Sequence, residues 1–332
     1  MRLNKNIKIF LNYFLGPVIF IWLSWSIYQQ IKQQPNLEQS WQQIKQSFSG
    51  PLIINLFIVV LLMLANWSLE ALKWKLSVRE VQHVSFLKSL KAIFSGVSFS
   101  VTTPNRMGEY AGRILYMEEG NRLRVVSLTI LGSLSQLIIT LSFGLAGLLI
   151  LKNRIIGAGL IEWTRWFDLI LIGVAIALVV LTVFYFRLRW LAFWLDRVPA
   201  LSKYSYLISE LEKVNATLLW QLLSLSAVRY LIFGMQYYLL FRFFAVDINW
   251  WQAFWPASVT FLVLAIIPTI ALVELGLRGE ISIKMIGLFS PNSLGIGFAT
   301  TTIWFVNLVV PALIGSLLIL SVKIFRSKNE SS

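Results

Sequence analysis

Long stretches without a charged residue constrain the fold of this chain more than any other feature. Most of them exceed the ~18 residues that indicate a transmembrane helix. They lie at residues 9–31, 46–69, 125–151, 169–186, 248–273 and 285–322. The composition agrees, because 57% of the residues are hydrophobic and 13% charged, against about 45–50% and about 25% in a soluble domain. We therefore expect an all-α, polytopic membrane protein, which excludes a water-soluble enzyme.

The chain is expected to form one transmembrane domain, residues 1–332. About six spanning helices are expected, at about residues 9–30, 50–72, 125–151, 167–187, 215–243 and 294–322. The first apolar run is too long for a signal peptide and lacks a small-residue cleavage site, so we expect a retained helix. The Gln-rich residues 31–49 are expected to form an extracytoplasmic interfacial helix or loop, as a lid or as a connector. Residues 187–213 combine Arg and Lys with Trp, which is typical of a helix on anionic lipid.

Two segments between these spans carry polar breaks and are expected to be re-entrant hairpins. In residues 92–118 the charge-free run is only 14 residues long, and it is followed by structural breaks at Pro104 and Gly108. Residues 250–288 repeat this plan with breaks at Pro268 and Gly276. Non-helical backbone persists at membrane depth only where protein buries it or where it lines a wet cavity. Each segment is therefore expected to enter and leave the membrane on one side.

The distribution of basic residues favours this topology. With both hairpins re-entrant and both termini cytoplasmic, the inside loops carry 18 Lys and Arg residues and the outside loops carry 5. If both segments spanned instead, the split would fall to 14 against 9, so the positive-inside rule favours the hairpins. The two hairpin units then run in opposite directions, which is the inverted-repeat architecture of secondary transporters.

The first hairpin contains the charged run TTPNRMGEYAGR. A charge at membrane depth costs at least about 2.5–3.5 kcal/mol, so each one is a candidate functional residue. Arg106, Glu109 and Arg113 are spaced by three and four residues, which predicts a ladder along one helical face. A guanidinium is a planar partner for a lipid phosphate, and Glu109 would partly neutralise the site without a ligand. Gly108 and Gly112 predict a close approach of another backbone or a head group.

The second hairpin contains the charged run ALVELGLRGEISIK. Glu274 and Arg278 are four residues apart, as are Glu280 and Lys284, so two ion pairs are expected. The alternative is that the charges of the two hairpins pair only with each other and hold a scaffold together.

One further cation, Arg229, lies deep inside an expected span. Its expected partner is Glu109 or Glu274, either within an anion site or as a structural counter-ion. Glu70 and Arg242 lie near the ends of expected spans, where snorkelling to the interface is sufficient.

Motifs for enzyme chemistry are absent from the sequence. The chain has no Cys and one His, which excludes disulfides, thiol chemistry and a zinc site built on histidines. Asp168, Asp196 and Asp247 are scattered, and no Walker A, GxSxG or HExxH sequence occurs. We expect no cofactor, no metal site and no nucleic-acid partner. Acid–base chemistry by Glu109 with Glu274 is kept as a minor alternative.

Three runs resemble the integral membrane family named for the transmembrane region of lysylphosphatidylglycerol synthase, also called flippase-like domain proteins. They are TTPNRMGEYAGRILYMEEG, SAVRYLIFGMQYYLL and IPTIALVELGLRGE, and the resemblance covers nearly the whole chain. Pro104, Arg106, Gly108 and Glu109 match the family's Pro-x-Arg-x-Gly-Glu motif. The second motif departs, because residues 273–274 are Val-Glu where many members have Gly-Gly.

The resemblance implies a lipid-translocating module without the soluble aminoacyl-transfer domain, so a lysyl transferase is not expected. We expect a central cavity that passes a phospholipid or a polyprenyl-linked lipid between the leaflets of the inner membrane, with membrane lipids as partners. The candidate head-group residues are Arg106, Glu109, Arg113, Arg229, Glu274, Arg278 and Glu280. The alternatives are a membrane scaffold or a partner of a head-group transferase, bound to an enzyme of cell-envelope synthesis.

Overall fold

The structure is a computed structural model of the whole chain, and it describes residues 16–33, 37–101, 103, 106–160, 164–187 and 214–329. Within these residues it contains helices and no strand, so the expected all-α class is confirmed. The expected interfacial helix at 187–213 and the expected break at Pro104 lie outside the described residues.

Five described helical segments are long and apolar enough to cross a membrane. They are Pro51–Val78, Arg124–Gly157, Arg165–Phe186, Ala216–Phe243 and Ser293–Ile319. These correspond to five of the six expected spans. The expected first span, residues 9–30, begins outside the described residues, and its described part is α2 (Gly16–Gln33). The chain is an integral membrane protein.

The spanning helices extend beyond the apolar runs in the sequence. Helix α4 (Ile54–Val78) follows a short 3₁₀ turn, and α7 covers Arg122–Gly157. Helix α8 is Thr164–Phe186 and α11 is Ala216–Phe243. The last segment consists of α14 (Ser293–Trp304), a π-helical turn and α15 (Val310–Asn329). Before α4, the Gln-rich segment forms α3 (Leu37–Ser49), so it is a helix rather than a loop.

The first hairpin consists of α5 (Phe86–Ser100) and α6 (Gly108–Ile114), which pack against each other. It begins earlier than expected, because the Ser85 side chain accepts a hydrogen bond from the Lys88 amide and caps α5. The two helices touch backbone to backbone: a Cβ atom on Gly112 would lie 2.3 Å from the Gly96 nitrogen. A side chain there would therefore force the helices apart.

The second hairpin consists of α12 (Trp250–Ile266) and α13 (Ala271–Ile286), joined by a non-helical turn that contains Pro268. Asn249 begins α12 with a capping box, in which the side chains of Asn249 and Gln252 bond each other's backbone amides. Gly276 lies within α13, so the expectation of a structural break there is wrong. A glycine costs only about 1 kcal/mol inside a helix, which tertiary packing offsets.

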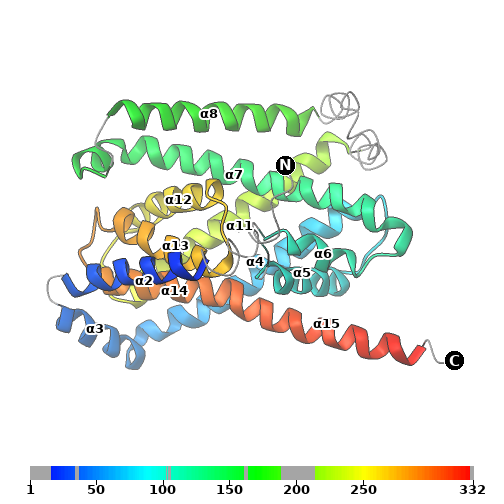
Figure 1. Cartoon of the computed structure of the whole chain (residues 1–332), viewed down its shortest axis with the longest axis horizontal. Helices are drawn as coiled ribbons and strands as arrows, with labels where there is room; N and C mark the ends of the chain where they lie inside the picture. The colour runs from blue at the N-terminus through cyan, green and yellow to red at the C-terminus, as the bar shows by residue number, and fades with distance from the viewer. Residues whose placement is uncertain are drawn as a thin grey trace.

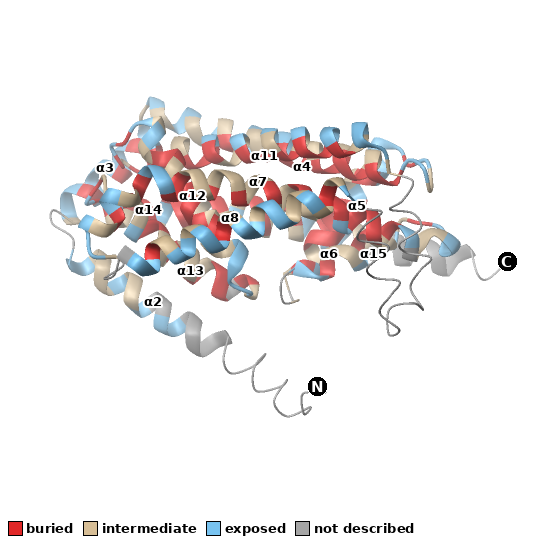
Figure 2. Cartoon of the chain, turned by 90° about the horizontal axis from the view of Figure 1, so that it is seen from above, coloured by how far each residue is buried: buried red, intermediate tan, exposed pale blue. Residues whose placement is uncertain are grey.

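Buried positions follow α4, α5, α11 and α12, whereas α8 is mostly exposed (Figure 2). The exposed side chains of α8 are large and apolar, as Ile172, Ile176 and Val179 show. Such a surface fits lipid rather than water. In Figure 1 the two hairpins lie on opposite sides of the middle of the molecule, where α4 and α11 pack together.

Candidate functional site

A cavity of 440 Å³ lies between the two hairpins and the core helices. Its walls come from α4, α6, α7, α11, α12, α13 and the segment around the π-helical turn. Eight charged side chains line it: Glu70, Lys73, Arg106, Glu109, Arg113, Arg229, Glu274 and Arg278. Five of these are cationic and three are carboxylates, so the lining carries a net charge of +2 with every group ionised.

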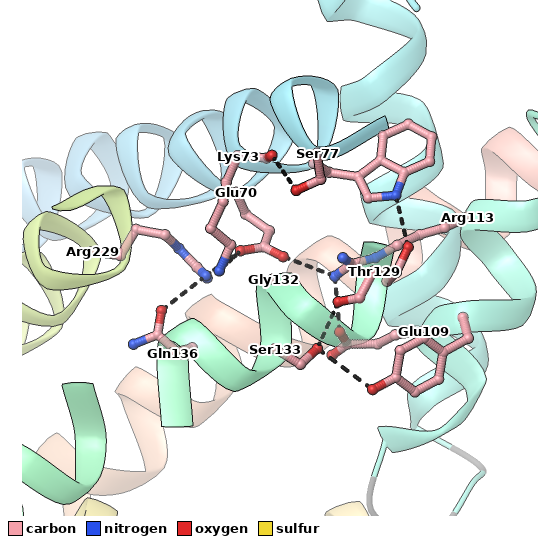
Figure 3. Close-up of polar contacts among 12 residues, drawn as sticks. Glu70, Lys73, Ser77, Glu109, Arg113, Thr129, Gly132, Ser133, Gln136 and Arg229 are labelled. Atoms are coloured by element: carbon pink, nitrogen blue, oxygen red, sulfur yellow. Dashed lines mark hydrogen bonds and ion pairs between the residues drawn. The ribbon is translucent and has the colours of Figure 1, made fainter. Parts of the chain in front are cut away.

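Glu70 on α4 is the centre of the first charged group, which we call the deep cluster: Glu70, Lys73, Glu109, Arg113 and Arg229. Its carboxylate accepts from Lys73 Nζ at 2.9 Å, from Arg113 Nη2 at 3.0 Å, and from Arg229 Nη1. Figure 3 shows Arg113 and Arg229 reaching Glu70 from opposite sides. One buried carboxylate therefore joins α4, α6 and α11.

Further hydrogen bonds hold the deep cluster in place. Arg229 Nε donates to Asn66 Oδ1 at 2.8 Å, and its Nη1 also donates to Gln136 Oε1 at 3.3 Å. Lys73 Nζ donates to Ser226 Oγ at 3.3 Å. The Arg229 guanidinium also lies over the Trp67 ring, 5.9 Å from its centroid, where a cation–π attraction acts. These contacts fix the guanidinium before any ligand arrives.

The second charged group, which we call the open cluster, consists of Arg106, Glu274 and Arg278. Arg106 Nη2 donates to both carboxylate oxygens of Glu274, at 3.0 and 3.1 Å. Arg278 pairs with the same carboxylate and donates to Tyr237 Oη at 3.0 Å. Because Arg106 precedes α6 and Glu274 lies on α13, this pair connects the two hairpins.

The backbone of Arg106 is in the left-handed region, with φ at 56°. A residue with a Cβ atom is strained there by about 1–2 kcal/mol. The expected ladder of Arg106, Glu109 and Arg113 on one helical face is therefore wrong, because α6 begins only at Gly108. The Glu109–Arg113 part does form, at 3.0 Å. Arg106 instead reaches away to the other hairpin.

Two further expectations are wrong, one about the partner of Arg229 and one about the location of Glu70. Arg229 pairs with Glu70, rather than with Glu109 or Glu274 of a hairpin. Glu70 does not snorkel, because its residue is only 5% exposed. The expected span ended at residue 72, whereas α4 continues for more than another turn to Val78 and carries Lys73 into the core. The signal available in the sequence was the three-residue spacing of Glu70 and Lys73.

Glu280 does not line the cavity. It is six residues from Glu274, which turns it to another side of α13. There it accepts hydrogen bonds from Ser26 at 2.9 Å and from Gln30 at 2.6 Å, and it pairs with Lys284 at 3.1 Å. The expectation that Glu280 belongs to the head-group residues is therefore wrong, and Glu280 instead holds α2 against α13. A smaller, apolar cavity of 250 Å³ lies along the same α2–α13 boundary.

Several cavity-lining donors have no hydrogen-bond partner among the described residues. They are Trp67 Nε1, Arg113 Nε, Tyr230 Oη, Arg278 Nε and Trp304 Nε1. A buried unpaired donor costs about 1–3 kcal/mol, so its presence calls for an explanation such as a bound ligand. Within the described part of the chain, no group of three or more His, Cys, Asp or Glu residues is arranged for a metal ion.

Comparisons with known proteins give one match. A family model described as the lysylphosphatidylglycerol synthase TM region matches residues 13–315. No curated protein and no solved structure matches the chain. The family match confirms the resemblance that the three sequence runs indicate.

Proposed function

We propose, from the premise that this chain belongs to the family described as the lysylphosphatidylglycerol synthase TM region, that it moves a lipid between the leaflets of the inner membrane. The lipid is a phospholipid or a polyprenyl-linked lipid. The observation that carries this proposal is the cation-rich cavity of 440 Å³ between two hairpins, in a chain with five described helical segments long and apolar enough to span a membrane. A volume in this range accommodates a head group.

In this proposal the parts of the protein have different roles. The cations that line the cavity hold the head-group phosphate, since a guanidinium presents paired donors to phosphate oxygens. The acyl chains stay in the lipid that surrounds the apolar helices. Arg106 is the candidate for the moving contact, because its side chain is 44% exposed and its partner Glu274 lies on the other hairpin.

A second candidate function is a membrane scaffold for an enzyme of cell-envelope synthesis. One observation favours it: all three carboxylates of the cavity already pair with cations. Such pairing is also what a site needs when no ligand is bound. The two candidates differ in whether the purified protein moves lipid by itself.

The deciding experiment is lipid flipping in proteoliposomes with head-group-labelled lipids and a membrane-impermeant quencher. Phospholipid and polyprenyl-phosphate probes are compared, with and without a proton gradient. Wild type is expected to flip at least one probe, and Arg106→Ala and Glu109→Gln are expected to lose the activity. Arg79→Ala and Glu80→Gln are matched controls, because that neighbouring pair is exposed and lies outside the cavity. Wild-type activity equal to that of empty liposomes would favour the scaffold.

The proposed orientation, with both termini in the cytoplasm, has a direct test. The chain has no Cys, so one introduced cysteine gives one labelling site. Glu38→Cys in α3 and Arg79→Cys after α4 are both exposed positions. In spheroplasts, an impermeant maleimide is expected to label the first and not the second. The reverse pattern would invert the topology.

A further inference from the structure

The charge balance of the cavity bears on which head group it accepts. Its five cations share three carboxylates. Glu70 is held by three cations, Glu274 by two, and Glu109 by Arg113. A cationic head group would need a carboxylate of its own, and it would find each one in the cavity already paired. An anionic head group would find an excess of positive charge.

The unpartnered polar atoms of the cavity also favour an anionic head group. Trp67 Nε1, Arg113 Nε and Trp304 Nε1 are donors that lack a partner among the described residues, and an indole or a guanidinium nitrogen cannot accept. Two unpartnered oxygens among the described residues also line the cavity: Asn307 Oδ1, an acceptor on a neutral amide, and Tyr230 Oη, a hydroxyl that can donate or accept. The vacant bonding capacity is therefore mainly that of donors, which suits the acceptor-only oxygens of a phosphate.

The two clusters are also arranged similarly around aromatic rings. Arg229 lies over Trp67, and Arg278 lies over Phe261, each 5.9 Å from the ring centroid. In each case the guanidinium carbon lies within the distance at which a cation–π attraction acts. The N–H donors of Arg229 and Arg278 bond oxygen atoms, those of the Glu70 and Glu274 carboxylates among them, which is the chemistry that a phosphate also offers.

We infer that the cavity selects a net-anionic, phosphate-bearing lipid head group and rejects a cationic, aminoacylated one. This inference rests on the proposed function only in taking a lipid as the ligand. It concerns which lipid binds, and binding is measured separately from flipping. An aminoacylated lipid such as lysylphosphatidylglycerol is then a poor ligand for this chain, although the family description carries that name.

The test is equilibrium binding to the full chain in nanodiscs, with labelled phosphatidylglycerol and labelled lysylphosphatidylglycerol as probes. The two lipids share the glycerophosphate core and differ in the lysyl group. Phosphatidylglycerol is expected to bind at least about tenfold more tightly, because like charges placed together at a binding site oppose association strongly. Equal affinities, or tighter binding of the lysyl lipid, would overturn the inference.

A variant sharpens the test by changing the charge of the cavity. Gln136 lines the cavity and accepts a hydrogen bond from Arg229, so Gln136→Glu adds a carboxylate of the same shape beside a cation. The preference for phosphatidylglycerol is expected to fall severalfold. Gln43→Glu on the exposed face of α3 is the matched control, and it is expected to keep the wild-type ratio. If Gln136→Glu does not fold, the wild-type ratio alone still decides the question.

Soluble competitors identify the recognised group. Inorganic phosphate and glycerol phosphate are expected to displace labelled phosphatidylglycerol, whereas glycerol and lysine are not. Displacement by lysine but not by phosphate would contradict an anion site. The outcome is independent of transport: selective binding without flipping would overturn the translocase and keep the anion site, whereas flipping without head-group preference would do the opposite.

Discussion

The deep cluster and the open cluster each contain a carboxylate that several cations share, Glu70 and Glu274, but they differ in exposure. In the deep cluster the side chains of Glu70, Arg113 and Arg229 are 7%, 4% and 9% exposed. In the open cluster Arg106 is 44% exposed, although its partner Glu274 is 11% exposed. Removing one partner of a buried ion pair is strongly destabilising, whereas an exposed ion pair contributes little to stability and can exchange its partner.

This difference assigns different roles to the two clusters. The deep cluster joins α4, α6 and α11 through the mostly buried charges of Glu70, Arg113 and Arg229, so it sets the shape of the cavity. The open cluster joins the two hairpins through one exposed guanidinium on a strained backbone. A ligand phosphate can therefore compete with Glu274 for Arg106 far more easily than with Glu70 for Arg229.

The largest effect is expected for Glu70→Gln in the deep cluster. The variant leaves Lys73, Arg113 and Arg229 buried around a neutral amide, and breaking a buried pair in this way costs about 3–5 kcal/mol. We expect a sharp loss of thermal stability in detergent, measured by the unfolding midpoint. Glu80→Gln, whose carboxylate is 63% exposed, is the control and should melt like wild type. If both variants melted at the same temperature, burial of the Glu70 carboxylate would not make the deep cluster more important for stability than an exposed ion pair.

The two hairpins themselves are expected to respond differently to the same substitution. Gly112→Ala in α6 would place a methyl group within 2.3–2.5 Å of the α5 backbone, which cannot move aside, and overpacking of this kind costs about 1–3 kcal/mol. Gly279→Ala in α13 meets the end of the Ile27 side chain at 2.7 Å, which can rotate away. A comparison of their melting temperatures tests whether the first hairpin is the more rigid one. A larger loss for Gly279→Ala would reverse that order.

The fold was largely predictable from the sequence, and the hairpins were predictable because their interruptions are local. Apolar runs longer than a membrane is thick, and a polar break at Pro268, need no tertiary knowledge. Ion pairs between residues four apart on a helix were predictable for the same reason, as Glu109 with Arg113 shows.

The contacts between distant elements were not predictable. Glu70 was assigned to an interface because the apolar run ended there, whereas α4 continues to Val78 and buries the carboxylate among three cations. The pairing of Arg106 with Glu274 joins residues 168 positions apart, and Arg106 has a positive φ that is uncommon for a residue with a side chain. No periodicity in one sequence encodes either contact.

A smaller effect on stability, but a large effect on function, is expected for Arg106→Gly in the open cluster. Glycine relieves the left-handed strain, and the exposed pair that is lost is worth about 0–1 kcal/mol, so stability should change by less than about 1 kcal/mol. Binding of an anionic lipid should be lost. Ala245→Gly is the matched control, because Ala245 has the same φ of 56° and does not line the cavity. It should gain stability and keep binding. Intact binding in Arg106→Gly would remove Arg106 from the site.

The smallest effect is expected for Lys284→Gln, in a charge pair that shares α13 with the open cluster but lies outside the cavity. Lys284 is 52% exposed, and an exposed pair four residues apart on a helix contributes about 0.3–0.5 kcal/mol. Glu280 also keeps its hydrogen bonds from Ser26 and Gln30. Melting and lipid binding should therefore both match wild type. Weaker binding would mean that charge anywhere on α13 acts on the head group through the long-range field, and that the open cluster is not a local site.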